Sequence, residues 1–147
     1  MRILALDGIH ADGLTLFRNE GWTVETAEPI KDQQTLAAKL KGFDAVLVRS
    51  ATTVGAEAIA DANELKVIGR AGAGVDTIDV EAATARGIAV MNAPDGNTLA
   101  AAEHAISLLF ALARHIPRAD AGMKAGEWPK AGLTGFELEG KRLGVIG

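Results

Sequence analysis

The sequence predicts an α/β domain built on a parallel β-sheet. Up to Pro94, short apolar runs typical of buried strands alternate with longer segments that have the spacing of amphipathic helices. Strands that alternate with helices are joined by right-handed crossovers, which makes the strands parallel and puts helices on both faces of the sheet. The shares of apolar residues, 48%, and of charged residues, 23%, fit such a globular domain.

The individual elements follow from these runs. Strands are predicted at residues 3–6, 23–26, 45–48, 67–68 and 88–91. Helices are predicted near residues 11–20, 31–41, 54–62 and 79–86. The last helix has the clearest boundaries, because Asp79 can cap its first turn and Gly87 can end it.

A second region follows the predicted sheet. Asn97 or Thr98 can cap a long helix that runs to about Ile116. This helix is apolar around most of its circumference, so we expect it to be buried between two bodies rather than to lie on one surface. A looser segment with several glycines is expected over 117–140, and a new strand over 141–147. Because a single strand forms no sheet, the chain is expected to be a fragment.

Composition narrows the classes of function. At 147 residues the chain has room for one domain, or for one domain and part of another. Its net charge of −4 and the lack of a basic cluster argue against nucleic acid as a partner. It has no cysteine, and its three histidines lack metal-ligand spacing, so no metal is expected. The longest apolar run, 105–113, is less than half of the ~20 residues that a membrane span needs, so we expect a cytoplasmic protein without a membrane partner.

The segment 66–76 carries the clearest chemical signal. A short apolar run leads there into a loop that contains Gly69, Arg70, Gly72 and Gly74. Glycines let the backbone approach a ligand closely with its N–H groups pointing outward. A guanidinium group suits a carboxylate or a phosphate. Together they predict an anion-binding loop at the end of a strand.

This loop is a poor match to a dinucleotide fingerprint. The segment 72–74 supplies two of the three glycines of the G-x-G-x-x-G pattern, but the third position is Thr77. The acidic residue expected about 20 positions further on would fall at Asn92. By contrast, residues 143–147 are typical of what precedes such a fingerprint, with Gly147 as its first glycine.

Arg49 and Ser50 close the third predicted strand, at the edge where open α/β sheets bind ligands. Arg70 stands at the equivalent end of the next strand, so two arginines would face one crevice. A solvated arginine and a turn serine are the plain structural alternative, and both interpretations stay open. The same holds for Asn97 and Thr98, which suffice as turn and cap residues but stand at a helix N-terminus suited to anions.

Several separate motifs, in the right order, resemble the D-2-hydroxyacid dehydrogenase family. They are Arg49-Ser50, residues 67–79 and residues 81–94. Residues 96–105 and 123–128 are similar to the branch of this family that acts on a phosphorylated 2-hydroxy acid. The similarity covers essentially the whole chain, which makes it far more specific than one glycine pattern.

The resemblance implies two domains. Residues 1–97 would form a flavodoxin-like substrate-binding domain with a parallel sheet. Residues 98–147 would hold the interdomain and dimerisation helix and the first strand of a Rossmann NAD-binding domain. The complete protein would then be a homodimer or homotetramer that uses NAD as its cofactor and a small phosphorylated 2-hydroxy acid as its substrate.

The resemblance also assigns site residues. Those that would line the substrate site are Arg49, Ser50, Arg70, Gly72, Ala73, Gly74, Asn97 and Lys130. Backbone amides of the 72–74 loop would hold the substrate carboxylate, and Lys130 would reach the substrate phosphate of the neighbouring subunit. NAD would approach Ala73, Thr98 and Gly147, although relatives often have threonine where Ala73 stands.

No catalytic residue is expected in this chain. In the family, an imidazole paired with a carboxylate takes the hydroxyl proton as hydride leaves for NAD, and an arginine orients the substrate. The resemblance puts all three downstream of Gly147, together with the residues that choose between NAD and NADP. The chain alone is therefore expected to be inactive.

Other interpretations stay open. The chain could belong to a dehydrogenase of the same family that acts on a smaller acid, although Lys130 argues against this. It could also be a stand-alone flavodoxin-like binding or dimerisation module, because the apolar helix at 98–116 needs a partner. A phosphoacceptor receiver domain would need an aspartate at the end of the third strand, where Arg49 and Ser50 stand.

Overall fold

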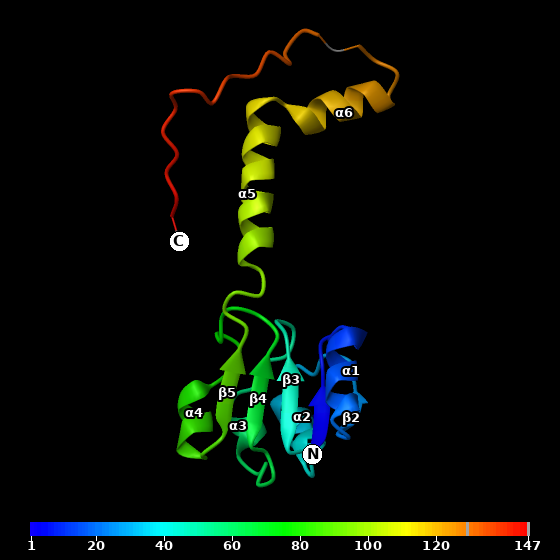
Figure 1. Ribbon diagram of the computed structural model, residues 1–147, viewed down its shortest axis with the longest axis vertical. Coiled ribbons are helices and arrows are strands. Elements are labelled where there is room, and N and C mark those ends of the chain that lie inside the picture. The colour runs from blue at the N-terminus through cyan, green and yellow to red at the C-terminus, as the bar shows by residue number, and fades with distance from the viewer. Residues whose placement is uncertain (129, 147) are drawn as a thin grey trace. The chain divides into compact units, whose positions relative to one another are not determined.

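The computed structural model describes residues 1–128 and 130–146, and the chain divides into two compact units, Met1–Asn97 and Thr98–Gly147. The strands of the first unit are β1 (Arg2–Ala5), β2 (Thr23–Thr26), β3 (Ala45–Val48), β4 (Val67–Arg70) and β5 (Ala89–Asn92) (Figure 1). All neighbouring strands are parallel, in the order β2-β1-β3-β4-β5. This is the flavodoxin-like order. The predicted α/β fold is confirmed, and every strand boundary lies within two residues of its predicted position.

Helices connect these strands, and their bounds are α1 (Ala11–Asn19), α2 (Gln33–Leu40), α3 (Ala56–Ile59) and α4 (Val80–Ala85). The predicted boundaries of α4 are confirmed. The side chain of Asp79 accepts a hydrogen bond from the N–H of Ala82 at 2.9 Å, and Gly87 follows the helix with a φ of +70°. By contrast, α3 is shorter than the helix predicted at 54–62, because Val54 forms a β-bridge with Ile78 instead.

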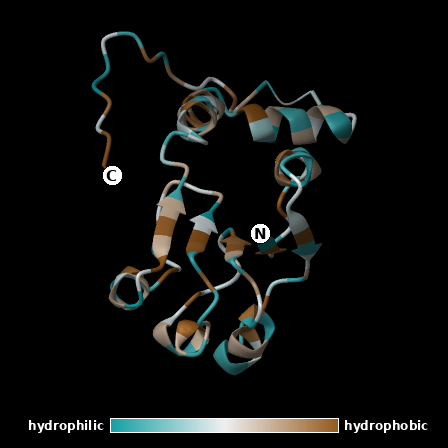
Figure 2. Cartoon of the chain, turned by 60° about the horizontal axis from the view of Figure 1, so that its bottom comes forward, coloured by the Kyte–Doolittle hydropathy of each residue, from teal (hydrophilic) through white to brown (hydrophobic). Residues whose placement is uncertain are grey.

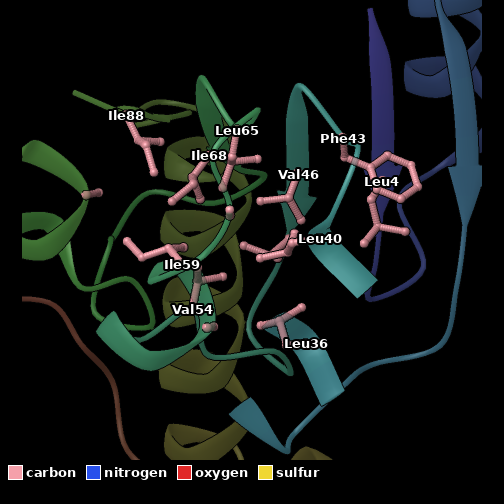
Figure 3. Packing of buried hydrophobic residues seen from close by; sticks show 14 of the residues in the cluster. Leu4, Leu36, Leu40, Phe43, Val46, Val54, Ile59, Leu65, Ile68 and Ile88 are labelled. Carbon is pink, nitrogen blue, oxygen red and sulfur yellow. The ribbon is translucent and has the colours of Figure 1, made fainter. Parts of the chain in front are cut away.

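The main core lies between one face of the sheet and the helices α2, α3 and α4, which share that side (Figure 2). Alternate strand residues such as Leu4, Val46 and Ile68 point toward this side and are fully buried (Figure 3). Leu36 of α2 and Ile59 of α3 are fully buried in the same cluster. Each such side chain stabilises the fold by about 1.5–3 kcal/mol.

The opposite face of the sheet is covered only in part. The helix α1 lies on this side, where it packs against β2. A hollow of about 510 Å³ remains over the middle of the sheet, and its mostly apolar lining includes Leu47, Val67 and Met91. The prediction of helices over both faces is therefore only partly correct, because α1, which connects β1 to β2, is the only helix of the first unit on this second face.

In its described residues, the second unit holds the helices α5 (Thr98–Ala113) and α6 (Ile116–Lys124). The helix α6 lies mostly in the segment 117–140, which is predicted to be loose because a proline, Pro117, follows the predicted end of the long helix at Ile116. Proline is, however, well accepted in the first turn of a helix. His115 separates the two helices with a φ of +52°. No single helix in residues 1–128 and 130–146 is long and apolar enough to cross a membrane, and α5 and α6 meet that test only as a pair bent by 68°.

In the described residues, the strand expected after α6 is not found, and the expected burial of α5 does not occur within this chain. The apolar helix α5 buries only Ala113, while Leu99 and Leu112 are each 71% exposed. The strand predicted over 141–147 is absent from the described residues 141–146. A strand is held by hydrogen bonds to a neighbouring strand, and the described part of this unit contains no other strand that could supply them.

Candidate anion-binding site

The loops that follow β1, β3 and β4 lie at one edge of the sheet and form the candidate site. The connections run in opposite directions from the middle of the sheet, so the crevice between β1 and β3 is its topological switch point. Ligands of open α/β sheets bind outside the carboxyl ends of the strands at this point. Arg49 and Ser50 directly follow β3, and Arg70 is the last residue of β4. The fold thus brings these predicted residues to one edge.

Arg70 directs its guanidinium group toward the backbone of two loops. Its Nε donates a hydrogen bond to the carbonyl oxygen of Arg49 at 3.2 Å, and its Nη1 donates one to the carbonyl oxygen of Gly74. Its Nη2 lies 3.4 Å from Oδ1 of Asp76, and the side chain is only 11% exposed. Arg70 therefore braces the loops at Arg49 and Gly74, whatever ligand it also meets.

The glycines of the 72–74 loop make room for this guanidinium group. A Cβ atom on Gly72 would lie 3.3 Å from Nη1 of Arg70, and one on Gly74 would lie 3.2 Å from the same atom. Neither glycine has a positive φ, so space rather than backbone conformation accounts for them. In residues 1–128 and 130–146, the N–H groups of Ala73 and Gly74 have no hydrogen-bond acceptor. These two donors are available to an anion.

The loop after β3 is joined to the loop after β4 at several points. The N–H of Ala71 donates to the carbonyl oxygen of Val48 at 2.9 Å. Further along, the N–H of Val54 donates to the carbonyl oxygen of Thr77 at 2.8 Å, and the carbonyl oxygen of Val54 accepts from the N–H of Asp79 at 2.9 Å. These hydrogen bonds fix the two loops to one another, while the side chains of Arg49 and Ser50 remain exposed.

The end of β5 holds the same loop from the other side. Nδ2 of Asn92 donates to the carbonyl oxygen of Ala73 at 2.6 Å, and the N–H of Ala93 donates to the carbonyl oxygen of Gly72 at 3.0 Å. Both bonds turn the carbonyl groups of the loop toward β5. Asn92 fails as the ribose-binding acid of a fingerprint, but it has a structural role in fixing the anion-binding loop.

Asp7 and Thr52 are the site residues that the sequence analysis missed. Asp7 follows β1 and is only 9% exposed, and Thr52 is fully buried. Burial raises the pKa of Asp7, but hydrogen bonds from the Thr52 hydroxyl and from the N–H groups of Arg49, Thr52 and Ala51 outweigh it and hold the pKa below its ordinary value. An aspartate directly after the first strand, at the switch point, was the signal that could have found it.

Other predicted residues lie outside this arrangement. Asn97 ends the first unit, and Thr98 begins α5 in the second. Lys130 is exposed in the second unit, beside a small apolar hollow of about 210 Å³ that is also lined by Trp128. Gly147 lies outside the described residues. The first unit therefore brings together Arg49, Ser50, Arg70 and the 72–74 loop, and the ligand-binding roles of all the predicted site residues stay predictions.

Comparison with known proteins decides the family. The model of the D-isomer specific 2-hydroxyacid dehydrogenase catalytic domain matches residues 3–139. The chain belongs to this dehydrogenase family. The match favours the enzyme interpretation over a stand-alone binding module. It also agrees with the α/β fold and the parallel sheet of the first unit.

Individual relatives and solved structures extend this match. The D-3-phosphoglycerate dehydrogenase of Archaeoglobus fulgidus is 46% identical over 147 residues, which is 100% of this chain and 28% of that protein. A crystal structure of a protein from Thermus thermophilus superposes with a TM-score of 0.85 at 30% identity, over 95% of this chain and 46% of that one. The NAD+-bound 3-phosphoglycerate dehydrogenase of Entamoeba histolytica gives a TM-score of 0.68 at 30% identity, over 78% and 39%.

Proposed function

We propose that the chain is the N-terminal, substrate-binding part of an NAD-dependent D-3-phosphoglycerate dehydrogenase. This enzyme oxidises 3-phospho-D-glycerate to 3-phosphohydroxypyruvate, the first step of serine biosynthesis. The observation that carries the proposal is the 46% identity to a D-3-phosphoglycerate dehydrogenase along all 147 residues. The anion-binding loops at the carboxyl edge of the sheet support it, because the substrate carries a carboxylate and a phosphate.

In this proposal the first unit binds the carboxylate end of the substrate. The N–H groups of Ala73 and Gly74, which have no acceptor in the described part of the chain, donate to the carboxylate oxygens. The exposed guanidinium of Arg49 and the hydroxyl of Ser50 supply further donors from the adjacent loop. Charge-assisted hydrogen bonds of this kind are about twice as strong as neutral ones.

The second unit is proposed to recognise the phosphate and the partner subunit. Lys130 is a point charge on a flexible stem and would reach the substrate phosphate of the neighbouring protomer. The apolar side chains of α5, such as Leu99 and Leu112, would be covered in a homodimer or homotetramer. Asn97 would border the substrate, and we propose the cytoplasm as the location of the complete enzyme.

NAD, when bound, accepts a hydride from C2 of the substrate. Ala73, Thr98 and Gly147 are the residues of this chain proposed to approach it. In the described residues, Gly72 and Gly74 make room for Arg70 and the segment 141–146 is not a strand, so neither segment has the strand and glycine turn of a dinucleotide fingerprint. The proposed role of this chain is therefore to bind and orient the substrate, and the base that takes the hydroxyl proton is expected outside it.

The test is a comparison of substrates with the complete protein that carries this chain. Reduction of NAD should be fast with 3-phospho-D-glycerate and slow with unphosphorylated D-glycerate and D-lactate. The 147-residue chain alone should reduce no NAD with any of them. A preference for an unphosphorylated acid would instead make the protein another D-2-hydroxyacid dehydrogenase, and activity of the short chain would show that its catalytic residues lie within it.

A further inference from the structure

A buried carboxylate lies directly beneath the loop that presents Arg49. Oδ2 of Asp7 accepts hydrogen bonds from the N–H groups of Arg49 at 2.9 Å, Ala51 at 3.2 Å and Thr52 at 3.0 Å. Its Oδ1 accepts a hydrogen bond from the hydroxyl of Thr52. Four donors therefore meet a single carboxylate, and all four belong to the loop after β3.

Thr52 extends this cluster to a third segment. Its Oγ1 donates to Asp7 and also accepts a hydrogen bond from the N–H of Ile30 at 3.1 Å. The side chain of Thr52 is fully buried, so both bonds are shielded from water. The loop after β3 is thereby tied to the end of β1 and to the segment that precedes α2.

The backbone of Arg49 is held from both sides as a result. Its N–H donates to Asp7, and its carbonyl oxygen accepts from Nε of Arg70. The side chains of Arg49 and Ser50 nevertheless remain exposed at the switch point. A rigid backbone that carries an exposed guanidinium is what substrate orientation requires, because a misplacement of about 1 Å can cost about 100-fold in rate.

We infer that Asp7, together with Thr52, is a positioning residue for substrate binding, because it fixes the backbone from which Arg49 and Ser50 reach the substrate. The inference rests on the proposed function, in which these two side chains meet an anionic acid. Asp7 itself does not touch the substrate in this assignment, since both of its oxygens already accept hydrogen bonds from the protein.

Electrostatics and positioning predict opposite results when Asp7 is replaced by asparagine. The variant Asp7→Asn removes a negative charge near the site of an anion, and by charge alone it would bind the substrate more tightly. A neutral amide has a single acceptor oxygen, so it cannot accept all four hydrogen bonds, and the loop after β3 is held less firmly. Positioning therefore predicts weaker binding.

The experiment uses the complete protein and three variants, Asp7→Asn, Thr52→Val and Thr52→Ser. Asp7→Asn and Thr52→Val should each raise the KM for 3-phospho-D-glycerate about tenfold and leave the KM for NAD unchanged. Thr52→Ser keeps the hydroxyl and should restore the KM to within about twofold of the wild type. Thr52→Val is close to threonine in shape, so it decides the matter alone if Asp7→Asn does not fold.

Three outcomes would overturn the inference. A lowered melting temperature with an unchanged substrate KM in Asp7→Asn and Thr52→Val would make the cluster merely structural. A lowered KM in Asp7→Asn would make it an electrostatic element. If the wild type oxidised no 2-hydroxy acid at all, the proposed function would fail first, and that result is distinct from a failure seen only in the variants.

Discussion

Nε of Arg70 donates a hydrogen bond to the carbonyl oxygen of Arg49 over 3.2 Å, and this bond couples the ends of β4 and β3. The same guanidinium group holds the carbonyl oxygen of Gly74. An arginine expected from the sequence to meet a ligand thus also shapes the site around it. Its planar set of donors serves two loops at once, which suits a guanidinium group better than a single ammonium group.

The variant Arg70→Lys should therefore weaken substrate binding, although it keeps the positive charge. A single ammonium group cannot reach the carbonyl oxygens of Arg49 and Gly74 together, so the two loops lose a common brace. We expect the KM for the 2-hydroxy acid to rise about tenfold in the complete protein, with little change in the KM for NAD.

The matched control is Arg86→Lys. Nη2 of Arg86 donates a hydrogen bond to Oδ1 of Asn63 at 3.2 Å. Arg86 precedes β5 and Asn63 precedes β4, so both lie at the edge of the sheet opposite the site. This control should leave both KM values unchanged. Equal kinetics for the two lysine variants would show that Arg70 neither braces the loops nor contacts the substrate.

A second prediction concerns stability at acid pH. The pKa of Asp7 is held below its ordinary value of 3.8, so its carboxylate stabilises the folded state at every pH above that value. This contribution disappears as the pH falls through the lower, folded-state pKa, because the proton then binds the folded form as well. The free energy of unfolding, measured with urea from neutral to acid pH, should decline less steeply in Asp7→Asn than in the wild type.

The control for this measurement is an exposed carboxylate, that of Asp12. Asp12→Asn changes a side chain that is 93% exposed, and it should leave the wild-type slope in place. Asp44 also has a lowered pKa, because of its hydrogen bonds from Lys66 and from the N–H of Arg2, so it accounts for part of the wild-type decline. A slope in Asp7→Asn equal to that of the wild type would mean that the Asp7 carboxylate does not stabilise the fold.

The core between the sheet and α2 gives a third prediction. Leu36 is fully buried there, and Leu36→Ala should lower the free energy of unfolding by about 2–5 kcal/mol, since it leaves a cavity among packed side chains. Leu16→Ala removes the same atoms from a side chain that is 68% exposed and should cost less than about 0.5 kcal/mol. Similar losses in both variants would place Leu36 outside the folded core.

The strands were predictable from the sequence because the largely buried strands of a parallel sheet are short apolar runs. Ala45–Val48 is such a run, and it forms β3 at its predicted position. The helix α6 was not predictable by the same rules, because Pro117 is equally compatible with the end of one helix and the start of the next. The left-handed backbone conformation of His115 ends α5 and allows α6 to begin, and this conformation could not be predicted from the sequence.

The site was predictable in part. Strand ends can be located from the sequence, and so the proximity of Arg49 and Arg70 was expected and is confirmed by their hydrogen bond. The role of Asp7 was not predicted, because its partner loop begins 42 residues away and only the register of β1 against β3 brings the two together. The space that Gly72 provides for Arg70 likewise depends on a side-chain conformation rather than on a motif.

The last prediction concerns the phosphate of the substrate. If Lys130 reaches the phosphate on a neighbouring subunit, Lys130→Ala should raise the KM for 3-phospho-D-glycerate about tenfold and leave an unphosphorylated 2-hydroxy acid unaffected, because only the first substrate loses a charge partner. Lys124→Ala is the control, since its Nζ already lies 2.7 Å from Oδ2 of Asp120 on α6. The measurement is steady-state NAD reduction by the complete protein with both substrates. An equal effect of Lys130→Ala on the two acids would assign Lys130 to subunit packing rather than to phosphate recognition.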